Sequence, residues 1–239
     1  TEIYTLSLHD ALPISLKLDY FGYMKAFLHL MKPRVMSLVI FTCAVGLLIA
    51  PVKVSFLDAV FSLIAVALGS GAAGALNMWY ESDLDSLMTR TCLRPIPTGK
   101  LTKNQALAFG ILSSLVSVIA LYIFSNLIAA TILAITILFY VFVYTIWLKR
   151  KTPQNIVIGG ASGALPPVIG WAIATNGIAL EPIILFLIIF IWTPSHFWAL
   201  SLYKSEDYKK AKIPMLPVTS GIKTTKFNIF IYALILFPV

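Results

Sequence analysis

The stretch NMWYESDLDSLMTRTCLRPIPTG, residues 77–99, begins where a long apolar segment ends and charged residues appear. Asn77, Glu81 and Asp85 follow one another at intervals of four, so on a helix they form one polar stripe. Asp83 falls off that stripe and reaches the same centre only if the helix unwinds there. Oxygen ligands of this kind suit Mg²⁺, which takes one or two carboxylates and completes its shell with phosphate and water.

Two arginines, Arg90 and Arg94, follow one or two turns later. Their guanidinium groups match the geometry of phosphate oxygens. An ordinary charged loop with helix caps is the alternative, because most runs of charge are solvated. The mixture of signs and the presence of Asn77 on the stripe favour a site for a metal ion and a diphosphate.

The composition indicates a membrane protein. The chain has 239 residues, of which 59% are hydrophobic and 12% charged, and its mean hydropathy is +0.90. Soluble domains carry about 25% charged residues, and about 20 residues of helix cross a bilayer. We therefore predict an all-α polytopic helix bundle that encloses a central cavity. Seven spans are expected, the last one incomplete: 35–50, 56–79, 106–124, 127–148, 156–174, 182–202 and from 227 onward.

Both ends of the chain look unnatural. The opening TEIYTLSLHDALPI reads as the translation of a sequencing adapter, so residues 1–15 are expected to be foreign to the protein. Residues 16–239 are then the native domain, and we expect it to be truncated at its C-terminus, since the sequence stops inside an apolar run. The two cysteines form no CxxC pair, which gives no indication of a disulfide framework or a zinc site.

The basic residues predict the orientation. The segments before the first span and after the second, fourth and sixth hold 4, 4, 3 and 6 Lys or Arg, and the remaining connections hold only Lys53. By the positive-inside rule, the N-terminus and the 77–99 stretch face the cytoplasm. The positive-inside distribution therefore accounts for the net charge of +8, and no nucleic-acid partner is expected.

A second constellation lies at residues 192–218, WTPSHFWALSLYKSEDYKKAKIPMLPV. His196 sits within an apolar run, Tyr203 follows seven residues later on the same helical face, and Glu206 and Asp207 come near the helix end. A titratable side chain at membrane depth is costly and suggests a function. The alternative is a histidine that is hydrogen-bonded to a neighbouring helix.

Two shorter motifs complete the pattern. Tyr144, Lys149 and Arg150, at the end of the fourth span, border the same face as residues 77–99 and could hold a diphosphate. The fifth span carries Gly159, Gly160, Gly163 and the pair Pro166-Pro167, which predict a helix that is broken where it lines a cavity.

These motifs resemble the UbiA superfamily of intramembrane prenyltransferases, and within it the enzymes that farnesylate haem b. The block His-Phe-Trp-Ala-Leu at 196–200 is the specific part, because quinone-type relatives carry an aspartate motif there. Glu81 departs from the family's usual aspartate, and the family has nine spans. The matching residues are Asn77, Glu81, Asp83 and Asp85, then 88–95, 152–160 with Pro166-Pro167, 193–200, and Asp207-Tyr208 with 213–217.

The resemblance implies a reaction between farnesyl diphosphate and haem b, with Mg²⁺ as cofactor, in the bacterial cytoplasmic membrane. It implies a cavity open to the cytoplasmic side and a possible haem A synthase partner. His196 would be an axial haem ligand or a base. The implied metal ligands are Asn77, Glu81, Asp83, Asp85, Glu206 and Asp207. The implied diphosphate ligands are Arg90, Arg94, Tyr144, Lys149 and Arg150. The implied haem contacts are His196, Trp198 and Tyr203, and the implied catalytic set is Asn77, Asp85, Arg90, Arg94 and His196.

Two other functions stay open at this point. A related enzyme could prenylate an aromatic quinone precursor, although His196 in place of an aspartate argues against it. A transporter or a haem-binding membrane protein without chemistry would need no Mg²⁺, and the carboxylate stripe beside two arginines argues against that function.

Overall fold

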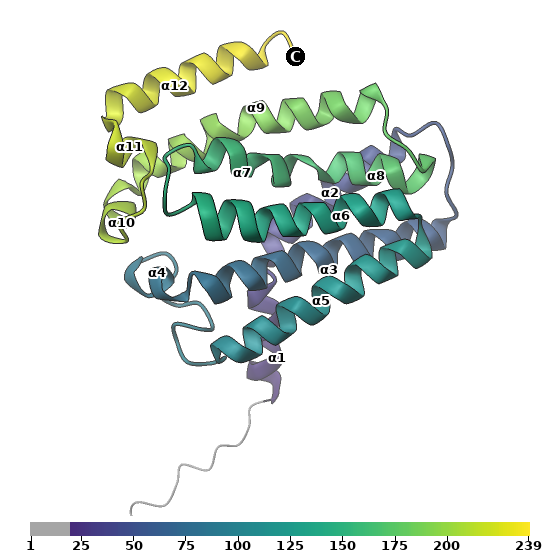
Figure 1. Ribbon diagram of the computed structural model, residues 1–239, viewed down its shortest axis with the longest axis horizontal. Coiled ribbons are helices and arrows are strands. Elements are labelled where there is room, and N and C mark those ends of the chain that lie inside the picture. The colour runs from purple at the N-terminus through teal and green to yellow at the C-terminus, as the bar shows by residue number, and fades with distance from the viewer. Residues whose placement is uncertain (1–19) are drawn as a thin grey trace, which may run out of the picture.

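The computed structural model describes residues 20–239, and the predicted adapter segment lies outside them. In this part of the chain all the regular structure is helical, as the sequence predicts (Figure 1). The elements are α1 (Tyr20–Leu30), α2 (Pro33–Leu48), α3 (Phe56–Tyr80), α4 (Ser82–Leu87), α5 (Lys103–Phe124), α6 (Leu127–Leu138), the π-helix η1 (Phe139–Leu148), α7 (Asn155–Ala164), α8 (Pro166–Thr175), α9 (Leu180–Tyr203), α10 (Ser205–Lys210), α11 (Leu216–Thr219) and α12 (Gly221–Leu236).

Five segments of the described chain are long and apolar enough to cross a membrane, or six if the bent pair α1 and α2 is one span. α6 with η1, and α7 with α8, each count as one of the five. α12 has 16 residues and is not among them. The all-helical membrane bundle is therefore confirmed, and the number of seven spans stays a prediction.

Local sequence signals explain several helix ends. α5 begins with a capping box, in which the Thr102 side chain and the Gln105 side chain each bond the other's backbone N–H. The turn between α5 and α6 closes with Asn126, whose side chain accepts from the backbone N–H of Ala129. The predicted break in the fifth span occurs at Leu165, since Pro166 lacks the N–H needed to continue α7.

A second break separates α1 from α2, whose axes differ by 52°. Lys32, between them, has a left-handed backbone with φ 53°, and Pro33 starts α2. Proline suits the first turn of a helix because the N–H there has no intrahelical partner. At this bend the Lys32 side chain points into the bundle, where it lines a cavity.

The helices pack closely where glycine permits it. α3 packs along α5 and α2, α2 packs against α8, and α9 lies between α7 and α12. At Gly46 of α2 an added Cβ would lie 2.0 Å from the carbonyl oxygen of Pro167. At Gly170 of α8 it would lie 1.9 Å from that of Cys43. α2 and α8 therefore meet backbone to backbone, as small residues allow in membrane bundles.

Candidate active site

A cavity of about 530 Å³ opens at the end of the bundle where α3 ends. Its walls come from α2, α3, α4, η1, α7, α9 and α10 and from the segments that follow α4 and α10. Seven of the residues singled out in the sequence line it together: Asn77, Glu81, Asp85, Arg90, Arg94, Tyr144 and Lys149.

The polar stripe continues from the end of α3 into α4. Asn77, Glu81 and Asp85 have exposed fractions of 2%, 2% and 3%. Glu81 donates its backbone N–H to the carbonyl of Asn77, and Asp85 donates its own to that of Glu81. These two bonds keep the four-residue spacing across the junction between α3 and α4. The three side chains consequently line one cavity.

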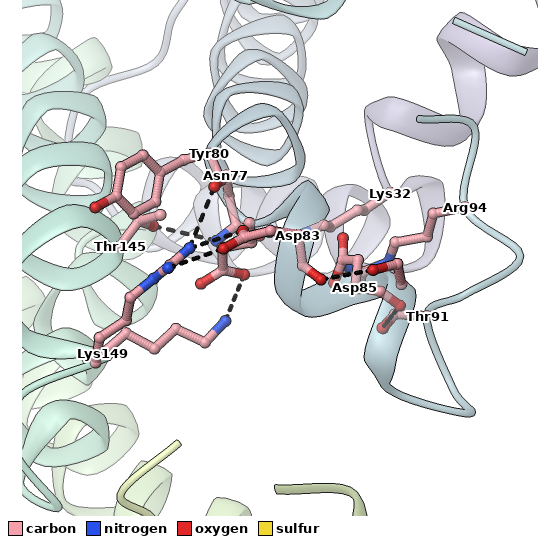
Figure 2. A network of polar contacts seen from close by, with 12 residues as sticks. Lys32, Asn77, Tyr80, Asp83, Asp85, Thr91, Arg94, Thr145 and Lys149 are labelled. Atoms are coloured by element: carbon pink, nitrogen blue, oxygen red, sulfur yellow. Dashed lines mark hydrogen bonds and ion pairs between the residues drawn. The ribbon is translucent and has the colours of Figure 1, made fainter. Parts of the chain in front are cut away.

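Cations neutralise the two buried carboxylates (Figure 2). Arg94 Nη1 lies 2.8 Å from both oxygens of Asp85. Lys149 Nζ lies 2.6 Å from Glu81 Oε2. Buried ion pairs of this kind cost stability when one partner is removed, because the other charge is then left without compensation.

Lys32 is a member of the cluster that the sequence did not reveal. Its Nζ donates to Asn77 Oδ1 at 2.5 Å, and Asn77 Nδ2 donates to Thr145 Oγ1 of η1 at 3.2 Å. Figure 2 shows Lys32 reaching the cluster from the α1–α2 break. Its position directly before Pro33 resembles an ordinary flanking cation, and only the left-handed backbone at Lys32 reveals its direction.

The donor set fits Mg²⁺. Glu81 Oε1 and Asn155 Oδ1 are buried, belong to cavity-lining residues and have no hydrogen-bond partner among the described residues. No group of three His, Cys, Asp or Glu in residues 20–239 could hold a metal by itself. Mg²⁺ needs no such group, since one or two carboxylates with phosphate and water complete its octahedron.

Asp83 and Arg150 form a separate pair at the rim. The Arg150 guanidinium lies 2.9–3.0 Å from the Asp83 oxygens, and neither residue lines the cavity. Partial burial raises the pKa of Asp83, but the hydrogen bonds from Arg150 and the backbone outweigh it, so the pKa lies below its usual value. Asp83 thus falls off the stripe, as its spacing indicates.

The remaining predicted metal ligands, Glu206 and Asp207, lie on α10. Glu206 is exposed, and Asp207 accepts a hydrogen bond of 3.0 Å from Thr89 Oγ1 in the loop after α4. Neither lines the cavity. Their role as metal ligands stays a prediction, and the Thr89 contact brings α10 beside the loop that carries Arg90.

The predicted haem contacts separate on α9. His196 is exposed and stacks on Trp192, a cavity-lining residue, with ring centroids 4.4 Å apart. Trp198 is buried on another side, edge-to-face with Tyr232 of α12 at 5.3 Å. Tyr203 is 91% exposed. His196 thus lies beside the cavity wall through Trp192, and Trp198 lies behind the wall, in a buried cluster with the cavity-lining residues Leu84, Met88 and Ile156.

Residues 39–239 match the UbiA prenyltransferase family. The chain belongs to that family.

Curated relatives within the family share one name. Protoheme IX farnesyltransferase of Pelagibacter ubique (strain HTCC1062) is 71% identical over 222 residues, covering 93% of this chain and 73% of the relative. The protein of the same name from Ehrlichia ruminantium (strain Welgevonden) is 55% identical over 225 residues, covering 94% and 76%.

Solved structures support the family's fold in this chain. A UbiA homolog from Archaeoglobus fulgidus bound to GPP and Mg²⁺ superposes with a TM-score of 0.72 at 20% identity, covering 88% of this chain and 75% of that one. A structure from work on digeranylgeranylglyceryl phosphate synthase gives a TM-score of 0.73 at 20% identity, covering 90% and 75%.

Proposed function

We propose that this chain transfers a farnesyl group from farnesyl diphosphate to a vinyl group of haem b. The observation that carries the proposal is the buried cluster of Asn77, Glu81 and Asp85, with Arg94 and Lys149 paired to it, at one end of a largely apolar cavity. The name shared by relatives up to 71% identical supports the same reaction.

The metal would be held by Asn77, Glu81 and Asp85. The sequence also predicts Asp83, Glu206 and Asp207 as ligands, but none of the three lines the cavity, so we give them no direct contact with the metal. Mg²⁺ supplies Lewis-acid stabilisation of the charge that develops on a departing diphosphate. Asn155 Oδ1 and Glu81 Oε1 are the buried oxygens still available to it. We add Asn155 to the candidate ligands for that reason.

The cations of the chain act on the leaving group. Arg90, Arg94, Lys149 and Lys32 face the same cavity and would bind the diphosphate oxygens, with Tyr144 beside them. Fixed positive charge stabilises the electron pair that leaves with diphosphate when the allylic C–O bond breaks. Arg150, paired with Asp83 at the rim, would act on the diphosphate only at the cavity entrance.

The apolar part of the cavity protects the farnesyl cation from bulk water. The vinyl π electrons of haem b then form the new C–C bond, and water adds to the resulting cation with loss of a proton. This sequence gives a hydroxyethylfarnesyl side chain without any oxidant. Ile189, Trp192, Thr193, Phe197 and Leu200 of α9 form the wall against which haem would lie.

His196 is proposed to contact haem, as axial ligand or as base. The orientation proposed from the basic residues places this site at the cytoplasmic face of a bacterial membrane, and a haem A synthase is the proposed recipient of the product. His196→Ala should lose haem conversion and retain binding of farnesyl diphosphate. If His196 is an axial ligand, the variant should lose the shift in haem absorbance that binding to the parent protein causes. If His196 is a base, the variant should keep that shift and lose turnover. Equal haem conversion would reject both roles.

The direct test supplies purified protein with haem b, farnesyl diphosphate and Mg²⁺. Mass spectrometry should find haem that has gained a farnesyl group and one hydroxyl group, and EDTA should stop its formation. 4-Hydroxybenzoate in place of haem b should give no product. Prenylation of 4-hydroxybenzoate would instead favour the quinone-type function, and the absence of diphosphate release with either acceptor would favour a non-catalytic protein.

A further inference from the structure

A second, smaller cavity of about 120 Å³ adjoins the polar one deeper in the bundle. Its far wall is apolar and includes Val66 of α3, Leu133 of α6 and Ile169 of α8. Six residues border both cavities and define what we call the neck: Lys32, Val35, Val39, Tyr140, Ser162 and Gly163. The neck therefore begins at the polar cluster, through Lys32, and leads into an apolar space.

Gly163 differs from the two other glycines of α7. At Gly159 an added Cβ would lie 2.1 Å from the Tyr144 ring, and at Gly160 it would lie 3.0 Å from Thr193. Packing explains the absence of a side chain at both. At Gly163 an added Cβ would meet no atom within 4 Å, and the residue is exposed. Here the helix backbone itself borders the two cavities.

We infer that Gly163 keeps the neck open and thereby sets the length of the prenyl chain that the protein accepts. The inference rests on the proposed function, which fixes the diphosphate end at Arg94 and Lys149. The reacting carbon stays in the larger cavity, where it must meet the acceptor. The far end of a fifteen-carbon tail then enters the smaller cavity, because its walls are mostly apolar and the neck residues border it and the larger cavity alike.

A side chain at position 163 would project into this passage. A leucine there obstructs a long tail and leaves room for a shorter one whose end stays in the larger cavity. Pockets discriminate between chains that differ by one methylene by about 10-fold to 200-fold, so one blocked isoprene unit should have an effect at least that large. The open space at Gly163 also means that substitution need not disturb packing.

The test compares Gly163→Leu and Gly163→Ala with the parent chain in detergent. The probes are the non-reacting thiodiphosphates of geranyl, with ten carbons, and farnesyl, with fifteen. Gly163→Leu should lower the affinity for farnesyl thiodiphosphate at least about tenfold and leave the affinity for geranyl thiodiphosphate nearly unchanged. Gly163→Ala should give a smaller change in the same direction. Gly177→Leu is the matched control, since Gly177 lies outside both cavities and an added Cβ there would meet its nearest atom at 3.8 Å.

Equal weakening of both probes, or no change in either, would overturn the inference. Circular dichroism identifies a variant that has not folded, and in that case Gly163→Ala, with its single methyl group, decides. The haem assay separates the two proposals. Chain-length selectivity at position 163 without farnesylated haem would reject the proposed function alone. Farnesylated haem with an unchanged ratio of affinities would reject the inference alone.

Discussion

Asp85 and Asp83 are two residues apart and have opposite surroundings. Asp85 is buried and accepts two hydrogen bonds from Arg94, whereas the Asp83 side chain is 53% exposed and pairs with Arg150 at the rim. Asp85→Asn should therefore lower kcat by about 100-fold or more, since it removes a carboxylate that would hold the metal beside the leaving diphosphate. Asp83→Asn should lower it less than about tenfold, because exposed ion pairs contribute little. Steady-state rates at matched protein levels measure both, and equal losses would make Asp83 a metal ligand as well.

Lys32 is the residue whose role depends most on the structure. Lys32→Met removes one cation from the cavity and the hydrogen bond to Asn77. We expect the KM for farnesyl diphosphate to rise about tenfold, which corresponds to about 1.4 kcal/mol of lost binding. Lys53→Met, in an exposed loop at the other end of the bundle, is the matched control. An unchanged KM would show that Lys32 only holds the Asn77 side chain in place and does not bind the diphosphate.

The sequence could place Asn77, Glu81 and Asp85 in one site because a four-residue spacing is a local property of a helix. It could not place Lys32, whose direction depends on a left-handed residue between two bent helices. Nor could it separate Trp198 from His196, since both belong to one apolar run and only the position of α12 decides which side is buried. The sequence alone therefore relates residues that share one helix, and the position of a side chain that depends on a second element needs the structure.

At the level of elements, glycine contacts hold α2 against α8. Gly170→Ala would bring a methyl group to within 1.9 Å of the Cys43 carbonyl oxygen, so the helices must separate. Overpacking of this kind costs about 1–3 kcal/mol, and we expect a matching loss in the free energy of unfolding, measured by titration from detergent micelles into SDS. Gly163→Ala is the control within a helix and should be neutral or stabilising, since alanine is the better helix former. A Gly170→Ala variant of parental stability would contradict the close packing.

Some breaks and irregular segments of the helices can be predicted from the sequence, and others cannot. Pro166 and the glycines before it predicted the α7–α8 break, because proline cannot donate to the preceding turn. The spans predicted at 106–124 and 127–148 likewise leave only Ser125-Asn126 for the turn between α5 and α6. The π-helix η1, which places Tyr144 at the cavity and Thr145 beside Asn77, was not predicted. Its composition is that of any apolar span, and its i→i+5 bonding has no distinct sequence period.

For the whole molecule, the distribution of charge agrees with the arrangement of the connections. The segments after α3, after η1 and after α9 carry most of the Lys and Arg and lie together at the end where the cavity opens (Figure 1). The connections α2–α3, α5–α6 and α8–α9 lie at the other end, where Lys53 is the single basic residue in these three connections. One end of the bundle is therefore basic and holds the polar site, which is the asymmetry that the positive-inside rule reads as cytoplasmic.

The chain supplies its own reporter of this orientation. Cys43 is buried, and Cys92, in the basic loop after α4, is partly exposed. A membrane-impermeant maleimide should therefore label Cys92 in inverted vesicles of the bacterial inner membrane and leave intact spheroplasts unlabelled, because the charge distribution predicts that the loop faces the cytoplasm. Lys53→Cys in a Cys92→Ser background should show the reverse pattern, since Lys53 is exposed at the other end. Labelling of Cys92 in intact spheroplasts would show that the bundle has the opposite orientation, and the site would then have to take its diphosphate from the periplasm.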